Sequence, residues 1–233
     1  MILHLVKGWY LPDWDNHYEK MLKEYNGKWE YQKDTRDYAL GFVKNFRTAL
    51  DIGGNIGFWS VDLCDKFNEV ISFEPHPHNI ECYKRNLTGK KNWTLEEVAL
   101  SDHQEKGATL FQSPDESGNV SLVSSGVENG NTKRKLKPEQ LKKSTTDVVM
   151  LDDYLKQFEG KNIDFIKVDC QAHEKEIVSG GLELLNQHDA VVCLELPLRN
   201  PDEVKYHDEV VDIMSTIGYI RRGNMRKETI FTR

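Results

Sequence analysis

Short apolar runs alternate with helical stretches through most of the chain. Runs with the composition of β-strands cover residues 48–52, 69–74, 93–100, 163–169 and 190–196. Helical patterns lie among them, at residues 58–66, 78–87, 152–158 and 174–185. Strand, helix and strand in succession are typical of parallel strands joined by right-handed crossovers. The pattern therefore predicts an α/β fold with a doubly wound, mostly parallel sheet.

Two segments interrupt this alternation. Residues 1–47 are rich in aromatic and charged side chains, and their spacing predicts helices that cover part of the sheet. Within residues 107–150, the runs 109–112 and 120–123 predict a hairpin, followed by a polar, lysine-rich stretch. We therefore divide the chain into an N-terminal helical cover, residues 1–47, and an α/β domain, residues 48–233, with an insertion at about residues 107–150.

The charge balance narrows the classes of function. The 233 residues include 38 acidic side chains against 31 lysines and arginines, a formal net charge of −7. A chain-wide grip on nucleic acid needs a positive surface, so this composition disfavours it. No apolar run approaches the ~18 residues of a membrane span, and Lys7 interrupts the apolar start of the chain. The four cysteines form no CxxC pair, which favours a reducing, cytoplasmic environment.

A glycine-rich loop follows the first core strand and precedes a helix, with the sequence Asp51-Ile-Gly-Gly-Asn-Ile-Gly57. Glycines let a backbone approach a ligand closely, and a helix N-terminus offers free N–H groups. A dinucleotide fingerprint needs glycines at the first, third and sixth positions; counted from Gly53, Asn55 and Phe58 occupy the other two. Asp51 would also repel a pyrophosphate. The loop thus disfavours NAD and favours a ligand with a positive centre.

Glu74 ends the second predicted strand, 23 residues after Asp51. A carboxylate in that place can accept two hydrogen bonds from a ribose diol, as in many nucleoside-binding α/β folds. An acidic residue at a strand end can also be a simple turn residue. The glycine loop at the appropriate distance favours the ribose-binding interpretation.

Five motifs in order resemble the FkbM-type family of class I S-adenosylmethionine-dependent methyltransferases. They are Asp51-Ile-Gly-Gly-Asn-Ile-Gly57, Phe73-Glu-Pro-His-Pro77, Ala99-Leu-Ser-Asp102, Leu151-Asp-Asp-Tyr154 and Ile166-Lys-Val-Asp-Cys-Gln-Ala-His-Glu174. The matches span roughly residues 48–200. The resemblance implies a Rossmann-like, seven-stranded, mostly parallel sheet whose last strand is antiparallel. It places S-adenosylmethionine over the carboxyl ends of the first strands.

The resemblance also implies roles for single residues. The glycine-loop residues Asp51, Gly53, Gly54 and Asn55 would face the methionine and sulfonium part of the cofactor. Glu74 would hold the ribose hydroxyls, and the turn from Ala99 to Asp102 would meet the adenine. One departure concerns Ala172, because the family usually has glycine there, which affects the shape of the acceptor side. His76 and His78 stand where small or polar residues are commoner.

Charged residues on the fourth core strand are the candidates for catalysis. Lys167 and Asp169 are two residues apart and so share one face of an apolar strand. Asp169 would point into the crevice that holds the transferred methyl group, and Glu195 would project into the same region. A purely structural ion-pair network, with Glu174 as the partner of Lys167, is the alternative. His173 is a further candidate base, although a histidine at a helix start is more often a surface residue.

Two further groups have both a functional and a structural interpretation. The basic cluster Lys133, Arg134, Lys135, Lys137, Lys142 and Lys143 is either a solvated loop or a landing site for an anionic acceptor. The group Trp29, Tyr31 and Gln32 either covers the cofactor or belongs to the core. His76 and His78 lack a third ligand at zinc-site spacing, so we predict no zinc site, and the sequence leaves magnesium at Asp169 and Glu195 open.

The sequence thus predicts a methyltransferase that uses S-adenosyl-L-methionine to methylate a hydroxyl of a sugar or other small molecule. Asp169 is the first candidate for the base, ahead of His173 and Glu195. An oxygen acceptor follows from the family resemblance alone. The alternatives are a nucleic acid or another anionic acceptor, a non-catalytic cofactor-binding module and a nicotinamide oxidoreductase. The sequence does not indicate the oligomeric state.

Overall fold

The computed structural model describes residues 2–24, 31–128 and 136–233. Its central sheet has seven strands in the order β12-β13-β11-β10-β3-β4-β5. These strands are β3 (Thr48–Ile52), β4 (Glu69–Phe73), β5 (Trp93–Glu96), β10 (Ile163–Val168), β11 (Val191–Glu195), β12 (Ile220–Met225) and β13 (Glu228–Thr232). Neighbouring strands are parallel, except that β13 is antiparallel to both of its neighbours. The predicted α/β class and the seven-stranded, mostly parallel sheet with an antiparallel last strand are confirmed.

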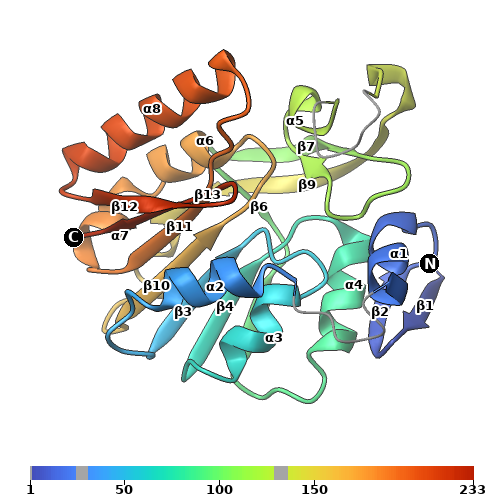
Figure 1. Ribbon diagram of the computed structural model, residues 1–233, viewed down its shortest axis with the longest axis horizontal. Helices are drawn as coiled ribbons and strands as arrows, with labels where there is room; N and C mark the ends of the chain where they lie inside the picture. Colours follow the sequence, from blue (N-terminus) through green and yellow to red (C-terminus); the bar gives the residue numbers. More distant parts are fainter. Residues whose placement is uncertain (1, 25–30, 129–135) are drawn as a thin grey trace.

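The inner strands are apolar because helices cover both of their faces (Figure 1). All residues of β3, β10 and β11 are buried, as expected for parallel strands inside a layered domain. One core cluster joins the sheet to α6 (Glu174–Ser179), α7 (Leu182–Gln187) and α8 (Pro201–Thr216). A second cluster joins the opposite face to α2 (Lys33–Leu40), α3 (Phe58–Cys64) and α4 (Pro77–Asn86). The carboxyl ends of the parallel strands stay uncovered by these helices.

The insertion forms a second sheet together with a short strand that precedes it. Its strands are β6 (Ala99–Ser101), β7 (Glu105–Gln112), β8 (Val120–Ser121) and β9 (Lys142–Met150), in the order β6-β9-β7-β8. The antiparallel pair β7–β8 is the predicted hairpin. The single predicted strand at residues 93–100 is wrong, because β5 belongs to the central sheet and β6 pairs with β9. An apolar run alone does not indicate which partner each half will pair with.

The predicted helices in the second half of the α/β domain need two corrections. Helix 174–185 is divided into α6 and α7 at Gly180 and Gly181, where a Cβ on Gly180 would lie 2.0 Å from the Ser101 carbonyl oxygen. The predicted helix 152–158 is only a 3-10 helix, Leu151–Tyr154. Its Asp152 carboxylate accepts a hydrogen bond from the Leu184 N–H at 2.8 Å and thereby caps α7.

The N-terminal segment contains a hairpin that the sequence pattern did not reveal. Strands β1 (Leu3–Val6) and β2 (Trp9–Pro12) are antiparallel and are joined by Lys7 and Gly8, at φ 51° and 91°. Two successive left-handed residues are typical of the tight turns that match strand twist. Helices α1 (Asn16–Glu24) and α2 follow the hairpin. No helix within the described ranges is long and apolar enough to cross a membrane.

Candidate functional site

Two adjoining cavities lie at the carboxyl ends of the parallel strands. Glu74, Asn79, Ala99 and His173 are among the walls of the first, the β4 cavity. The walls of the second, the β11 cavity, include Tyr18, Tyr31, Trp59, Lys167 and Glu195. Gly53, Asn55, Gly118 and Asp169 line both cavities. Open α/β sheets place small-molecule sites at this edge, outside the carboxyl ends of their strands.

The glycine loop brings the ends of β3 and β10 together. Gly53 has a φ of 79°, and a Cβ there would lie 2.0 Å from the carbonyl oxygen of Asp169, so only glycine fits. The Gly53 and Gly54 N–H groups both donate to the Phe73 carbonyl oxygen at 3.0 Å. Asp51 lies beneath this loop, fully buried, and lines neither cavity. Of the four predicted loop residues, Gly53, Gly54 and Asn55 reach the cavity walls.

Glu74 lies in the β4 cavity with its carboxylate oriented by the protein. Its Oε2 accepts from the Asn55 N–H at 2.8 Å, and its Oε1 accepts from the His76 N–H at 2.9 Å and from Asn79 Nδ2 at 3.2 Å. Burial raises the pKa of Glu74 to about 7 against the opposing effect of these hydrogen bonds. The carboxylate retains lone pairs that can accept further donors from a ligand.

The remaining walls of the β4 cavity are mainly apolar. They include Ile52, Phe73, Pro75, Val98, Ala99 and Leu100. The Glu74 carboxylate beside an apolar slot suits a nucleoside, whose base is flat and whose sugar carries the donors. Asp102 does not line the cavity; its half-exposed side chain contacts His103 Nδ1 at 2.8 Å. The structure therefore brings Ala99 into the site and leaves Asp102 outside it.

Lys167 lies among carboxylates at the end of β10. Its Nζ is 3.4 Å from Asp51 Oδ1, 3.8 Å from Asp169 Oδ2 and 3.3 Å from the Gly53 carbonyl oxygen. Burial alone would lower the pKa of Lys167, but Asp51 and Asp169 raise it above its usual value. The predicted pairing with Glu174 is wrong. The Glu174 Oε1 instead accepts from the Cys170 N–H at 2.8 Å, because the turn into α6 directs this carboxylate back onto the backbone.

Asp169 and Glu195 come together at the ends of β10 and β11, as the sequence predicted. Gln171 Nε2 donates to Asp169 Oδ1 at 3.0 Å and to Glu195 Oε2 at 2.9 Å. Burial, reinforced by the charge of Asp169, raises the pKa of Glu195 well above its usual value. Burial would also raise the pKa of Asp169, but the charge of Lys167 outweighs it and the net shift is downward. The two carboxyl groups thus favour opposite protonation states, with Asp169 ionised.

His173 belongs to the β4 cavity rather than to the carboxyl pair. Its Nε2 is 3.0 Å from Ser101 Oγ, and the ring is buried at the start of α6. Burial lowers the pKa of His173, so the imidazole is neutral near pH 7. Glu195 lines only the β11 cavity. The structure therefore places His173 and Glu195, the two candidate bases ranked after Asp169, in different cavities.

The profile of the Methyltransferase FkbM domain matches residues 51–221. The chain belongs to the FkbM methyltransferase family. The matched region holds every residue of the predicted site, so the resemblance of the five motifs is confirmed at the level of the family. A search among curated proteins found no match.

Solved structures share the fold of this FkbM-family chain. The methyltransferase FkbM of Methylobacillus flagellatus KT has a TM-score of 0.52 at 14% identity, over 95% of this chain and 55% of that one. This chain therefore spans about half the length of that protein. A SAM-dependent methyltransferase of Aquifex aeolicus has a TM-score of 0.46 at 15% identity, over 86% of each chain. A Streptococcus mutans protein crystallised with SAH has a TM-score of 0.49 at 8% identity, over 85% of this chain and 94% of that one.

Sequence reasoning missed one wall of this FkbM-family site, the segment 113–119 of the insertion. Its Ser117 N–H donates to Asp15 Oδ2 at 2.8 Å, and its Gly118 is so close to the Tyr18 hydroxyl that a Cβ would lie 2.2 Å away. The N-terminal helix α1 thereby holds this segment against the cavities. A long-range contact of this kind leaves no periodic signal in the sequence.

The predicted cover of the cofactor and the basic cluster lie only partly within the described residues. Tyr31 lines the β11 cavity, and Gln32 lies behind it, accepting a hydrogen bond from Trp59 Nε1 at 2.6 Å. Trp29 and the basic residues 133–135 lie outside the described residues. Lys142 and Lys143 extend over the rings of Trp14 and Phe111, at 4.5 and 5.4 Å, and line neither cavity.

Within the described ranges, no group of three or more His, Cys, Asp or Glu side chains could hold a metal ion.

Ala172 departs from the usual glycine of the family at a position whose backbone favours glycine. Its φ is 69°, in the left-handed region where a Cβ costs ~1–2 kcal/mol. Glycine avoids this cost but loses ~0.5–1 kcal/mol of chain entropy on folding. We therefore expect Ala172→Gly to stabilise the protein by ~0.5–1 kcal/mol in urea denaturation. Ala39→Gly, in the buried interior of α2, is the control and should destabilise the protein. A change in the free energy of unfolding with the same sign in both variants would contradict the prediction.

Proposed function

We propose that this protein transfers the methyl group of S-adenosylmethionine to a hydroxyl oxygen of a sugar or other small molecule. The observation that carries the proposal is the paired carboxyl groups of Asp169 and Glu195. Asp169 lines both cavities, so it lies where a cofactor in one and an acceptor in the other would meet. Family membership supports the reaction class, and the carboxyl pair supports an acceptor that must lose a proton.

The β4 cavity fits the nucleoside part of the cofactor. Glu74 would accept hydrogen bonds from the ribose hydroxyls, and the apolar walls around Ala99 would take the adenine. Two buried amide oxygens, Asn55 Oδ1 and Asn79 Oδ1, have no hydrogen-bond partner among the described residues, and both side chains line this cavity. Buried polar atoms are rarely left unpaired, so these oxygens favour a ligand rich in donors. When bound, S-adenosylmethionine supplies an electrophilic methyl group.

The protein would act mainly by alignment, exclusion of water and acceptance of one proton. The acceptor hydroxyl would hydrogen-bond to the Asp169 carboxylate, which takes the proton as the oxygen forms its bond to the methyl carbon and the carbon–sulfur bond breaks. Lys167, held between Asp51 and Asp169, keeps Asp169 ionised beforehand. The rings of Tyr18, Tyr31 and Trp59 wall the acceptor space.

The charge of the β11 cavity argues against an anionic acceptor. Its walls carry the carboxyl groups of Glu116, Asp169 and Glu195, and the ammonium group of Lys167 is already paired. A phosphate there would face repulsion without a free cation from these walls. We therefore propose an uncharged acceptor rather than a nucleotide sugar or a nucleic acid.

Cofactor binding gives the direct test. S-adenosylmethionine and S-adenosylhomocysteine should raise the melting temperature, because a ligand at a hundredfold excess over its Kd stabilises the native state by ~2.7 kcal/mol. NADH at the same concentration should leave it unchanged. Mass spectrometry of a metabolite extract incubated with methyl-labelled S-adenosylmethionine should then reveal a labelled hydroxyl compound. Cofactor binding without labelled product would indicate a non-catalytic binding module, and no shift with either sulfur nucleoside would overturn the cofactor assignment.

Cofactor affinity should depend on the ionisation of Glu74. Ribose hydroxyls donate to the ionised carboxylate, so binding favours the form present above the raised pKa of about 7. We expect the Kd for S-adenosylhomocysteine to be about tenfold weaker at pH 6 than at pH 8. Glu74→Gln should weaken binding about tenfold at pH 8 and abolish the pH step. Calorimetry on both proteins measures this, and the same pH step in Glu74→Gln would assign it to another group.

In the free protein the same ionisation acts on folding with a defined sign. Because the folded pKa of Glu74 lies above the ordinary value of 4.5, its contribution to stability is complete below pH 4.5. That contribution is lost as the pH rises through about 7. The stability falls because the ionised carboxylate of Glu74 is buried in the folded protein, and burial disfavours a charge.

A further inference from the structure

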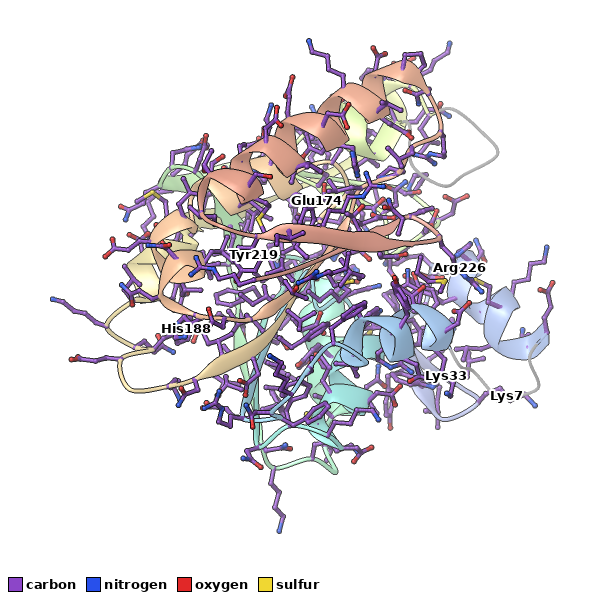
Figure 2. All side chains as sticks on the ribbon, turned by 60° about the vertical axis from the view of Figure 1, so that its left-hand side comes forward. Lys7, Lys33, Glu174, His188, Tyr219 and Arg226 are labelled. Carbon is purple, nitrogen blue, oxygen red and sulfur yellow. The ribbon has the colours of Figure 1, made fainter. Side chains whose placement is uncertain are left out.

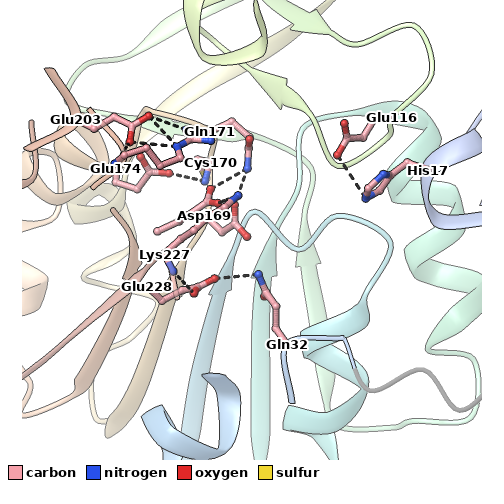
Figure 3. Close-up of polar contacts among 12 residues, drawn as sticks. His17, Gln32, Glu116, Asp169, Cys170, Gln171, Glu174, Glu203, Lys227 and Glu228 are labelled. Carbon is pink, nitrogen blue, oxygen red and sulfur yellow. Dashed lines mark hydrogen bonds and ion pairs between the residues drawn. The ribbon is translucent and has the colours of Figure 1, made fainter. Parts of the chain in front are cut away.

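The amide of Gln171 bridges two strands of the sheet at the candidate catalytic pair (Figure 3). Its nitrogen has two hydrogens, and it donates at 3.0 Å to Asp169, after β10, and at 2.9 Å to Glu195, at the end of β11. Each neighbour presents a carboxyl oxygen that accepts a hydrogen bond, so the amide nitrogen rather than the amide oxygen faces the pair.

The backbone at this residue is held in a conformation that side chains rarely adopt. Gln171 and Ala172 have φ values of 54° and 69°, two successive left-handed residues without glycine. Such strain persists only where the surroundings impose it, and it concentrates at functional sites. Here the Cys170 N–H donates to the buried Glu174, and Ser121 Oγ donates to the Gln171 carbonyl oxygen at 2.9 Å.

The insertion packs directly on this turn. Gly126 lies in the short helix α5 (Ser124–Glu128), and a Cβ on it would come within 2.1 Å of the Gln171 carbonyl oxygen. Only glycine at position 126 allows α5 to pack this closely against the turn. The insertion therefore fixes the backbone that carries the bridging amide.

Other charged and polar groups surround the two carboxyl groups that Gln171 bridges. Lys167 approaches Asp169 Oδ2 at 3.8 Å, and Lys227 approaches Glu195 Oε1 at 3.3 Å. The buried groups Tyr31, Glu174 and Glu228 also act on the pair through their position or charge. Each carboxylate thus has one oxygen near an ammonium group and the other bound to Gln171. The plane of the Asp169 carboxylate is fixed from two sides.

We propose that Gln171 is a positioning residue for methyl transfer, whose amide fixes the orientation of the Asp169 and Glu195 carboxyl groups at the wall of the β11 cavity. The proposal rests on the proposed function, since it assigns Gln171 to the base of that reaction. Gln171 acts through Asp169 and is not itself the base. The strained turn and the insertion behind it serve to hold this amide in place.

The test compares Gln171→Leu and Gln171→Glu with the wild type. Leucine removes both donors, whereas glutamate keeps the size of the side chain and replaces the amide by an ionisable group. Gln104→Leu is the matched control, because Gln104 Nε2 also donates to a carboxylate, Asp153 at 2.9 Å, on the exposed surface. Folding of each variant is verified by the thermal shift with S-adenosylhomocysteine, whose proposed nucleoside site does not include Gln171.

Two readouts then separate positioning from general stability. In carbon-13 NMR titrations, with Asp169→Asn to assign the signal, the pKa of Asp169 should rise in Gln171→Leu and remain unchanged in Gln104→Leu. The rate of label transfer from saturating S-adenosylmethionine into a metabolite extract should fall about 10²-fold in Gln171→Leu, with the Kd for S-adenosylhomocysteine within twofold of the wild type. Gln171→Glu should recover part of the rate as the pH falls, because its protonated carboxyl group regains one donor.

The outcomes distinguish this inference from the proposed function. An unchanged Asp169 pKa and an unchanged rate in Gln171→Leu would overturn the positioning role, even if the wild type is an active methyltransferase. A wild type that neither binds the sulfur nucleosides nor transfers label would overturn the proposed function. Even then, the NMR titration would still test whether Gln171 controls the ionisation of Asp169. A loss of activity in Gln171→Leu with an equal loss of S-adenosylhomocysteine binding would also contradict positioning.

Discussion

Replacing Asp169 by asparagine is expected to slow methyl transfer by about 10²–10⁴-fold, the usual cost of removing a general base. Asparagine has the size of aspartate but accepts no proton from the acceptor hydroxyl. The measurement is the rate of label transfer from methyl-labelled S-adenosylmethionine to a hydroxylated product of the metabolite extract. The Kd for S-adenosylhomocysteine should barely change, since the ribose contact is assigned to Glu74.

The stability of the same variant separates chemistry from structure. Lys167 keeps its contact to Asp51 at 3.4 Å when Asp169 is neutralised, so the ammonium group is not left unpaired. We therefore expect a melting temperature close to that of the wild type. A large loss of stability with the remaining folded protein fully active would assign Asp169 to the ion-pair network. Normal stability and full activity together would move the base to Glu195 or His173.

Replacing Lys167 by methionine is expected to destabilise the fold by ~3–5 kcal/mol, because it leaves the buried Asp51 without its cation and Asp169 with one contact fewer. The side chain of Lys167 is 6% exposed and that of Asp51 is fully buried, so water cannot replace the lost contact. Urea denaturation followed by circular dichroism measures the loss. Figure 2 shows how densely side chains fill the layer between the ribbons around the sheet.

Lys175→Met provides the matched control for this substitution. Lys175 pairs with Glu209 at 3.0 Å, but these side chains are 33% and 41% exposed. Surface pairs of this kind contribute ~0–1 kcal/mol. If both lysine variants lost a similar free energy of unfolding, the burial of Lys167 would not explain its contribution to stability.

Local patterns in the sequence predicted the parallel core and the end of the sheet at which the site lies. The strands β3, β10 and β11 read as continuous apolar runs because they are buried on both faces. Parallel strands then bring their carboxyl ends to one edge, so Glu74, Asp169 and Glu195 converge without further information. The family resemblance added the number of strands and the antiparallel direction of the last strand.

The features that the sequence predicted wrongly or missed depend on contacts between distant segments of the chain. The run 93–100 contains no glycine or proline that would divide it, and pairing with β9 is what removes Ala99–Ser101 from the central sheet. The pairing of Lys167 with Asp51 rather than Glu174 depends on the register between β3 and β10. The approach of Ser117 to Asp15 joins residues 102 positions apart. No spacing rule within one element reports such contacts.

The N-terminal wall of the β11 cavity has a consequence for how such a protein can diversify. Tyr18 and Tyr31 line that cavity, yet both precede the region matched by the family profile, residues 51–221. Asp169 and Glu195 lie inside that region. The shape of the acceptor space is therefore encoded partly outside the stretch of sequence that carries the chemistry. We therefore expect that an exchange of the N-terminal segment would change the proposed acceptor space and leave Asp169 and Glu195 in place.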